Sequence, residues 1–239
     1  MKYAIIAAGE GARLVNAGVN TPKPLICLNG EPMIDRLIRI FADNNASSIS
    51  IIINEEMLEV YDHLLQTAYP VRPHVLRKST PSSMHSFWEL SSLIESNHFC
   101  LTTVDTVFRE DEFASFINDF EISISDGLFA VTNYVDDEKP LYVETGEDML
   151  IKAFHDEKMA DDCYVSGGIY GLSANSFPVL ETCIKTGISK MRNFQRQLIK
   201  SNFVIKAYPF SKIIDVDHPS DIPQAELLVT TASLPLPPK

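Results

Sequence analysis

Short apolar runs alternate along the chain with segments in which apolar residues recur every three or four positions. The runs stand at residues 3–7, 49–53, 99–104 and 128–132, and the helical period is clearest at residues 33–41. Short apolar runs are typical of strands covered on both faces, and the helical period marks the elements that cover them. The pattern therefore predicts an α/β fold with three layers, αβα, around a mixed, mainly parallel central sheet.

Residues 1–229 are predicted to form a single domain, because the 239-residue chain is long enough for one α/β unit with a substantial core. The crossover helix after the second long apolar run is predicted at residues 55–68. Residues 134–165 are largely polar and lack a strong period, and we interpret them as inserted hairpins that form a lid. Residues 230–239 are rich in Thr, Ser and Pro and are predicted to be a flexible tail.

The net charge of −12 limits the partners of the protein. An acidic surface repels nucleic acid and anionic membranes, and no apolar run is long enough to span a bilayer, so we expect neither partner. Four widely spaced cysteines without a Cys-x-x-Cys pair are expected to be free thiols in a reducing cytoplasm. The same acidity repels small phosphorylated ligands, so a site for them must be locally basic or contain a divalent cation.

The loop after the first apolar strand has a backbone suited to phosphate. Gly9 and Gly11, which follow Ala7 and Ala8, can adopt positive φ and carry no side chain that would keep an anion from the loop N–H groups. A Walker motif needs Gly-Lys-Ser/Thr, and the dinucleotide fingerprint needs a third glycine where Leu14 stands. Both motifs are therefore excluded, and an ordinary glycine-rich turn is the alternative.

Two cations follow the glycines at fixed positions. Arg13 offers a planar fork of donors for two phosphate oxygens, whereas Lys23 is a point charge. Pro22 and Pro24 restrict the backbone on either side of Lys23 and are expected to hold it extended. A plain turn has no need of a lysine between two prolines, which favours the phosphate site.

These residues resemble the signature of the sugar-1-phosphate nucleotidylyltransferases, within the nucleotidyltransferases of the GT-A type. The family pattern Gly-x-Gly-x-Arg-Leu, followed by Pro-Lys-Pro-Leu and Gly-x-Pro-Met-Ile, is matched at Gly9–Leu14, Pro22–Leu25 and Gly30–Ile34. The resemblance implies the GT-A fold and the transfer of a nucleotidyl group from a nucleoside triphosphate to a sugar 1-phosphate, with release of pyrophosphate. Arg13 and Lys23 would be the catalytic residues, bound to the triphosphate.

The resemblance also implies an Mg²⁺ site. Asp105 ends an apolar strand and precedes Phe108 as in the family, and alignment on Pro219 places the second metal ligand at Asp215. Asp217 would then contact substrate or act as an alternate ligand. Hard oxygen ligands suit Mg²⁺, which takes the rest of its shell from water and substrate phosphate. Taken singly, Asp105 could be a turn residue and Asp217 a helix cap.

Further family positions would bind the acceptor and the base. Lys158, in a segment similar to the family's Glu-Lys-Pro, would bind the acceptor phosphate, and a surface lysine is the alternative. Gly168, in a Gly-Gly-Ile-Tyr element, would let the acceptor approach the backbone, and a bend in a strand is the alternative. Ser83, or its neighbours Ser82 and Ser86, would contact the nucleobase, and serines that only cap a helix are the alternative.

Several other functions stay open. A CTP-dependent cytidylyltransferase acting on phosphocholine or a similar alcohol phosphate is suggested by Ser86 and by the Asp215-x-Asp217 spacing. A molybdopterin guanylyltransferase is disfavoured by the long spacing from Arg13 to Lys23, and a glycosyltransferase by the lack of Asp-x-Asp after a mid-chain strand. From another class, the chain could be a non-catalytic nucleotide-binding subunit. A homo-oligomer is compatible with the sequence.

Overall fold

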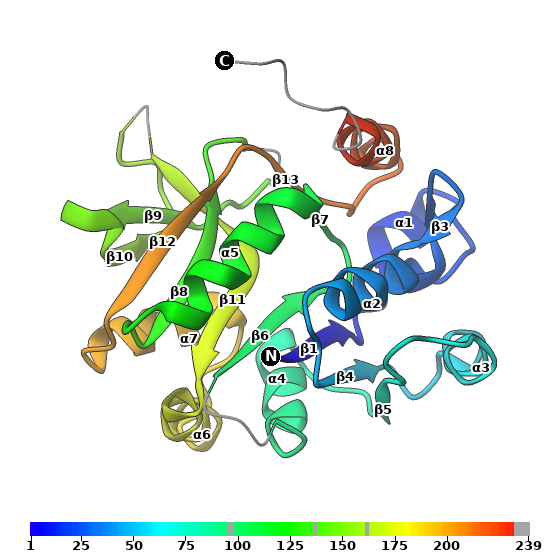
Figure 1. Cartoon of the computed structure of the whole chain (residues 1–239), viewed down its shortest axis with the longest axis horizontal. Helices are drawn as coiled ribbons and strands as arrows, with labels where there is room; N and C mark the ends of the chain where they lie inside the picture. Colours follow the sequence, from blue (N-terminus) through cyan, green and yellow to red (C-terminus); the bar gives the residue numbers. More distant parts are fainter. Residues whose placement is uncertain (95–97, 136–137, 161–162, 232–239) are drawn as a thin grey trace.

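The central sheet organises the molecule (Figure 1). The computed structural model describes residues 1–94, 98–135, 138–160 and 163–231. Within these ranges the sheet has nine strands in the order β10-β9-β11-β6-β1-β4-β5, with β8 beside β11 and β12 beside β8. The strands are β1 (Lys2–Ala7), β4 (Ser48–Ile53), β5 (His74–Arg77), β6 (His98–Thr103), β8 (Gly127–Thr132), β9 (Tyr142–Thr145), β10 (Ile151–His155), β11 (Tyr164–Ser173) and β12 (Ile205–Phe210).

The sheet is mixed, as predicted. Strand β1 runs parallel to β4 and β6, and β4 runs parallel to β5. Strand β11 is antiparallel to β6, β8 and β9. Since the carboxyl ends of β1, β4, β5 and β6 meet at one edge, the loops that follow these strands lie together, which is where ligands bind in sheets of this kind.

Helices cover both faces of the sheet. In β1, Tyr3 and Ile5 pack into a core that α2, α3 and α5 cover, while Ala4 and Ile6 pack under α4, α6 and α7. The first set is α2 (Met33–Asp43), α3 (Leu58–Gln66) and α5 (Glu110–Ile122), and the second is α4 (Ser83–Ser91), α6 (Phe177–Lys185) and α7 (Met191–Lys200). Helices α2 and α5 lie in front of the sheet in Figure 1. The predicted three-layer αβα fold is confirmed.

A third apolar cluster joins distant segments beside the sheet. Strand β7 (Thr106–Phe108) pairs with β13 (Ile213–Asp215) in antiparallel fashion. This ribbon packs against the short helix α1 (Ala12–Asn16), the hairpin of β2 (Cys27–Leu28) and β3 (Glu31–Pro32), and α8 (Asp221–Thr231). The cluster therefore holds the loop after β1 next to the end of β6 and the end of β13.

The segment predicted to form hairpins contains one. Strands β9 and β10 pair in antiparallel fashion within residues 134–165. Its residues 136–137 and 161–162, and residues 232–239 of the predicted tail, lie outside the described residues. The division into one domain of residues 1–229 with a lid stays a prediction.

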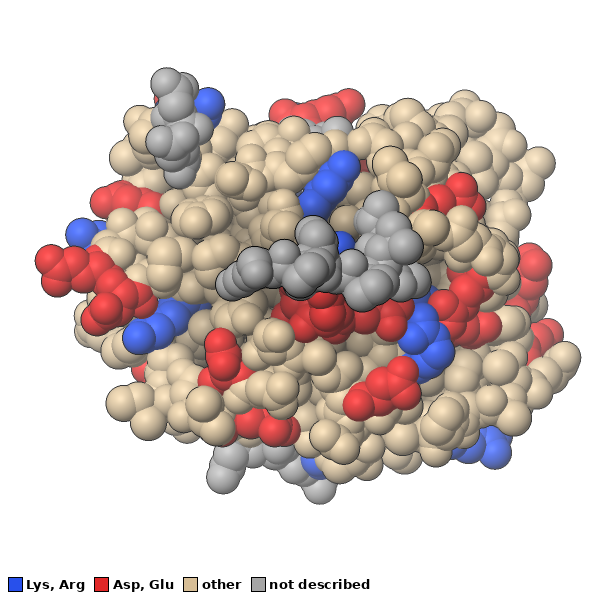
Figure 2. Space-filling view, turned by 45° about the horizontal axis from the view of Figure 1, so that its top comes forward, with Lys and Arg blue, Asp and Glu red and all other residues tan. Residues whose placement is uncertain are grey.

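The surface is acidic, in agreement with the net charge. In the view of Figure 2, acidic side chains outnumber basic ones and gather near the middle of the face. No helix in the described ranges is both long and apolar enough to cross a membrane. All four cysteines are free thiols, as predicted.

Gly171 allows the ring of Phe120 to pack directly on β11. A Cβ at position 171 would lie 2.8 Å from the Cγ of Phe120, which is closer than two carbons can approach. We expect Gly171→Ala to lower the free energy of unfolding by about 1–3 kcal/mol, measured by urea denaturation, because the buried ring must move.

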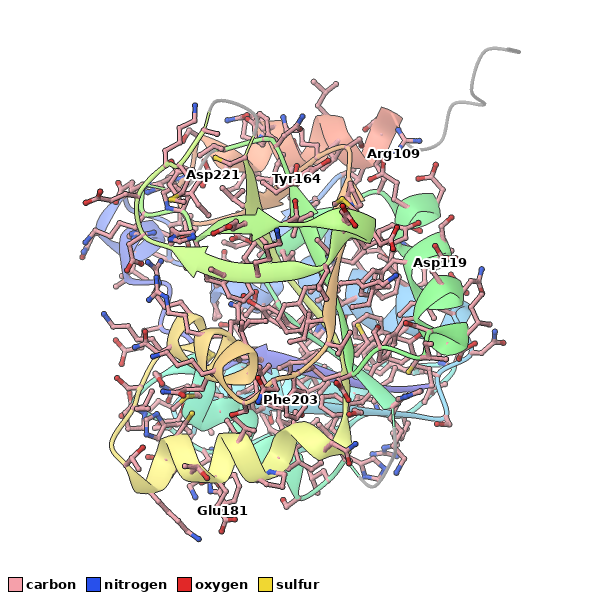
Figure 3. The ribbon with its side chains drawn as sticks, turned by 90° about the vertical axis from the view of Figure 1, so that its left-hand side faces the viewer. Arg109, Asp119, Tyr164, Glu181, Phe203 and Asp221 are labelled. Atoms are coloured by element: carbon pink, nitrogen blue, oxygen red, sulfur yellow. The ribbon has the colours of Figure 1, made fainter. Side chains whose placement is uncertain are left out.

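Glu181→Ala is the control for this variant. Glu181 lies on α6 and its side chain points away from the body of the molecule (Figure 3). This change is expected to leave the urea midpoint almost unchanged. If Gly171→Ala has the same urea midpoint as the control variant, the packing of Phe120 on β11 is looser than in the structure.

Candidate active site

In the loop after β1, the second glycine, Gly11, adopts the left-handed conformation that a phosphate-binding loop needs. Gly11 has φ of 61° and ψ of 33°, and its missing side chain lets Lys23 approach, since a Cβ would lie 3.3 Å from the Cβ of Lys23. Gly9, in contrast, does not have positive φ, so that part of the expectation is wrong. In the described part of the chain, leaving aside Gly9 and its two neighbours, no atom lies within 4 Å of the place where a Cβ on Gly9 would be. Gly9 therefore leaves open space above the loop.

Lys23 points inward from a short turn. Residues Lys23–Leu25 form one turn of 3₁₀ helix with Pro24 at its second position, so the expected extended conformation is wrong. The side chain is only 7% exposed, and its Nζ donates hydrogen bonds to Asp105 Oδ2 and, at 2.6 Å, to Asp217 Oδ1. Lys23 thus joins two carboxylates that are far apart in the sequence.

The β7–β13 ribbon brings these carboxylates together. Asp105 stands in the tight turn between β6 and β7, and its carbonyl oxygen accepts a hydrogen bond from the N–H of Val216 at 3.0 Å. Asp215 pairs with Thr106 across the ribbon, and the Thr106 hydroxyl donates to Asp215 Oδ1 at 3.1 Å. Asp217 follows two residues later. The structure therefore places Asp105, Asp215 and Asp217 at one point beside the glycine loop.

The charges at this point depend strongly on one another. Burial alone would lower the pKa of Lys23, but Asp105 and Asp217 outweigh it and hold that pKa above its usual value. Burial likewise opposes ionisation of Asp105, yet the Lys23 ammonium keeps the pKa of that carboxyl below its usual range. Asp215 is open to the cleft on one side. The protein atoms around Asp215 on its other sides remove part of its hydration, and the negative charges of Asp105 and Asp217 lie close to it. Burial first, and these charges second, raise the pKa of Asp215 to about 7.

Arg13 completes the charged cluster. Its side chain is half-exposed, and Nη1 donates to Asp217 Oδ2 at 2.7 Å, while Nη2 lies 3.8 Å from Glu138 Oε2. Both of the sequence-predicted cations, Arg13 and Lys23, are therefore paired with carboxylates of the same site. A polyanion that binds here must therefore replace Asp105 and Asp217 as the partners of these two cations.

A cleft of about 1010 Å³ opens above the charged cluster. On one side it is lined by the loops after β4 and β5, and on the other by β11 and the start of α7. Of the predicted residues, those in the wall are Ala8, Gly9, Gly11, Arg13, Lys23, Ser83, Asp105, Gly168, Asp215 and Asp217. The structure thus brings ten of the twelve together.

Two predicted residues are not in the cleft wall. Ala7 is buried at the end of β1, where it packs in the core. Lys158 is exposed in the loop after β10 and is not among the residues that line the cleft. Gly168 lines the cleft, and it also has a packing role: its φ is 75°, and a Cβ would lie 2.8 Å from the hydroxyl of Thr106.

The cleft contains residues that the sequence did not indicate. On the α7 side, these are Lys190, Arg192 and Gln195, of which Lys190 has a positive φ of 73°. Arg192 is oriented by Asp156 Oδ1 and by the carbonyl oxygen of Lys139, at 2.8 and 2.7 Å. Nothing in the local sequence separates these side chains from an ordinary polar helix start.

The carboxylates fit the donor set of Mg²⁺. Two of them already converge on one cation, the ammonium of Lys23. The pKa of the third, Asp215, is raised first by burial and then by the charges of the other two carboxylates. In the described part of the chain, no three His, Cys, Asp or Glu side chains are arranged to hold a metal ion by themselves. An incomplete set of hard oxygen ligands suits an ion that completes its shell with water and phosphate.

Comparison with known proteins agrees with this geometry. Residues 3–196 match the profile of the MobA-like NTP transferase domain. Among curated proteins, the bifunctional protein GlmU of Methanococcus maripaludis strain C7 is 22% identical over 227 residues, which cover 93% of this chain and 53% of that protein. The chain therefore spans about half the length of the curated relatives that it matches.

Solved structures share the fold over the whole chain. The inositol-1-phosphate CTP transferase from T. maritima has a TM-score of 0.82 and 15% identity, covering 99% of this chain and 98% of that chain. A putative glucose-1-phosphate thymidylyltransferase from Bacillus anthracis, solved with a sucrose, has a TM-score of 0.83 and 17% identity, covering 100% and 98%. At such low identity, these likenesses support the fold alone.

Proposed function

The chain belongs to the family of MobA-like NTP transferase domains, and on that premise we propose that it transfers a nucleotidyl group from a nucleoside triphosphate to a sugar 1-phosphate. One observation carries the proposal. Lys23, Asp105 and Asp217 come from three distant segments and meet beside the Gly9–Gly11 loop, at the floor of a cleft with two separate walls. Such an arrangement can hold two phosphorylated molecules in line.

The cationic side chains would bind the triphosphate. Arg13, half-exposed at the rim of the charged cluster, would turn its fork from Asp217 to phosphate oxygens. Lys23, buried below it, would neutralise negative charge that develops around the α-phosphate. Open space above Gly9 lets the phosphates lie on the loop backbone. Together these groups position the triphosphate for displacement of pyrophosphate.

The other wall would hold the acceptor. Arg192, fixed by Asp156, and Lys190 bring positive charge to the wall opposite the β4 and β5 loops. A phosphate monoester has a second pKa of about 6, so its oxygen is already ionised at neutral pH and needs no general base. We therefore place the acceptor phosphate at Arg192 and Lys190. The role predicted for Lys158 stays a prediction, and its exposed position gives it no support.

Asp105 and Asp217, the carboxylates that share Lys23, would hold Mg²⁺. When bound, the ion would neutralise phosphate charge as a Lewis acid. Asp215, the second ligand predicted from the sequence, lies beside them and receives the Thr106 hydroxyl. It would add negative charge to the same site.

A single assay tests the proposal. The purified protein is incubated with each of the four NTPs, Mg²⁺ and a panel containing several sugar 1-phosphates, inositol 1-phosphate and phosphocholine, and pyrophosphate release is measured. We expect release with one NTP and with sugar 1-phosphates. Release with CTP and an alcohol phosphate only would instead identify the cytidylyltransferase that the Asp215-x-Asp217 spacing suggested.

The assay also has a clear negative outcome. Nucleotide binding without turnover of any acceptor would identify a non-catalytic, nucleotide-binding subunit and would contradict the proposal. The retention of Arg13, Lys23, Asp105 and Asp217 in one cluster favours an active enzyme, because a subunit that only binds nucleotide has no need of carboxylates that repel it.

A further inference from the structure

Asn54 stands directly after β4, at the edge of the sheet where the glycine loop also lies. Its side chain is 9% exposed and lines the cleft. The carbonyl oxygen Oδ1 accepts two hydrogen bonds, from the N–H of Glu56 at 3.0 Å and from the hydroxyl of Ser79 at 3.0 Å. Both donors come from the loops that form one wall of the cleft, so the amide group is held from two sides.

These two bonds fix which end of the amide faces the cleft. Because a backbone N–H can only donate, the atom that it meets must be the carbonyl oxygen, and the amide nitrogen Nδ2 must point the other way. Within the described part of the chain, Nδ2 makes no hydrogen bond, and it is not sealed from solvent. Asn54 therefore presents two N–H donors in a fixed orientation, and partly buried donors of this kind normally have a partner.

The chemistry of this wall selects a neutral partner. No Lys or Arg is found among the cleft-lining residues of the loops after β4 and β5, and Glu55 and Glu56 add negative charge there. A phosphate is therefore disfavoured beside Asn54, and the cations that suit phosphate lie at the glycine loop and at the start of α7. A nucleoside triphosphate has two neutral groups, the ribose and the base. The ribose hydroxyls can donate as well as accept, so the base is the group that offers fixed acceptors to Nδ2.

The wall is also rigid enough to discriminate between bases. The hydroxyl groups of Thr80 and Ser86 are 2.6 Å apart, and Ser86 is buried, which ties the loop that carries Ser79 to helix α4. Ser79 in turn holds Asn54. A donor whose position is fixed in this way rejects a base that presents a donor at the same place, because neither group would then have an acceptor.

We propose that Asn54 determines which nucleobase is accepted, by donating hydrogen bonds from Nδ2 to a carbonyl oxygen or ring nitrogen of the base. The inference rests on the proposed function, since it assumes that the ligand in the cleft is a nucleoside triphosphate. It adds a specificity-determining residue for that reaction. Cytosine and uracil are good probes, because they have the same size and opposite donor and acceptor groups at N3 and at the exocyclic group of C4.

Asn54→Asp tests the proposal. The Asp carboxylate keeps the shape and can accept the same bonds from Glu56 N–H and Ser79, but it replaces the donor by an acceptor. Binding of the four NTPs and of inorganic tripolyphosphate, each with Mg²⁺, is measured by calorimetry for both proteins. Tripolyphosphate has no base, so its affinity reports the general repulsion by the added charge.

The expected result is selective. Relative to tripolyphosphate, the NTP that the unaltered protein prefers should bind Asn54→Asp roughly ten- to a hundred-fold more weakly. If that NTP is a pyrimidine, the order of CTP and UTP should reverse. Ser79→Ala removes one of the two hydrogen bonds that hold the amide. It should also weaken binding of the preferred NTP relative to tripolyphosphate, but by a smaller factor than Asn54→Asp does.

The controls separate two kinds of failure. If Asn54→Asp weakens all four NTPs and tripolyphosphate by the same factor, the side chain does not read the base and the inference about Asn54 is overturned, while the proposed function stands. If the unaltered protein binds neither tripolyphosphate nor any NTP, the proposed function itself fails and the inference falls with it.

Discussion

Replacing Asp105 by asparagine is expected to abolish the release of pyrophosphate, with a loss of turnover on the order of 10³-fold or more. Asp105 shares the ammonium of Lys23 with Asp217, and in the proposed function these two carboxylates would hold Mg²⁺. The side chain of asparagine has the same size and no charge. The variant would therefore lose a charge that balances Lys23 and an anionic ligand for the proposed Mg²⁺, and metal stabilisation of phosphoryl charge amounts to several kcal/mol.

Two measurements distinguish this loss from unfolding. Asp105→Asn should melt cooperatively at a lower temperature than the unaltered protein, because buried Lys23 loses one of its two partners, but still above the assay temperature. Its stabilisation by Mg²⁺ with an NTP should largely disappear. Asp111→Asn is the matched control, because Asp111 is an exposed aspartate on α5 whose described side-chain contacts are with Arg109. Asp105→Asn activity within ten-fold of that control would reject the metal assignment.

The sequence predicted the parts of the site that follow directly from strand ends. The glycine loop and Asp105 each stand just after an apolar run, and in a parallel sheet the carboxyl ends of such runs meet at one edge. The alternation of apolar runs with helical segments was therefore enough to predict the three layers and the place of the site. The expectation that residues 105 and 215 meet beside the loop came instead from the resemblance to the family, through the alignment on Pro219.

Contacts between side chains from distant segments could not be predicted in the same way. Asp215 and Asp217 are two residues apart, and which of them reaches Lys23 depends on the register of β13 on β7 and on the chain after β13. No local pattern encodes that register. The sequence favoured Asp215 as the partner of Asp105, whereas the structure gives Asp217 the contact with the shared lysine.

Asn54 shows how a local polar contact can override a helical period. The sequence predicts a helix at residues 55–68, but α3 begins only at Leu58. Because Asn54 Oδ1 accepts the N–H of Glu56, the chain makes a turn there instead of starting the helix. A polar residue directly after a buried strand was the available signal for this part of the site.

The prediction of the acceptor-binding residues depended on a short segment that matches the family pattern only in part. The resemblance to the family's Glu-Lys-Pro segment predicts that Lys158 binds the acceptor phosphate, yet Lys158 lies in an exposed loop outside the cleft wall. Arg192 and Lys190 take that side of the cleft because α7 packs beside β10 and its Gln195 forms hydrogen bonds with Ser166 and Tyr170 of β11. Packing between elements that are far apart in the sequence decides such positions. A single sequence considered alone does not reveal this packing.

Replacing Lys23 by methionine is expected to have two opposite effects. Turnover should fall by roughly 10²- to 10³-fold, as for the loss of one donor to a developing oxyanion. Binding of a divalent cation without nucleotide should become tighter, because the ammonium that lies between Asp105 and Asp217 competes with the ion for the same carboxylates. Two unit charges about 4 Å apart repel by about 4 kcal/mol at an effective dielectric constant of 20, and a divalent ion is repelled more strongly, so a gain of ten-fold or more is expected.

Electron paramagnetic resonance of Mn²⁺, which distinguishes free from bound ion, measures the second effect without any turnover. Lys190→Met is the matched control: it removes another lysine of the cleft wall, for which the described part of the structure shows no contact with Asp105 or Asp217. Its Mn²⁺ affinity should equal that of the unaltered protein. If Lys23→Met binds Mn²⁺ no better than Lys190→Met does, the ion does not bind between these carboxylates. If Lys23→Met instead keeps full turnover, Lys23 does not act on the triphosphate, and the charged cluster has only a structural role.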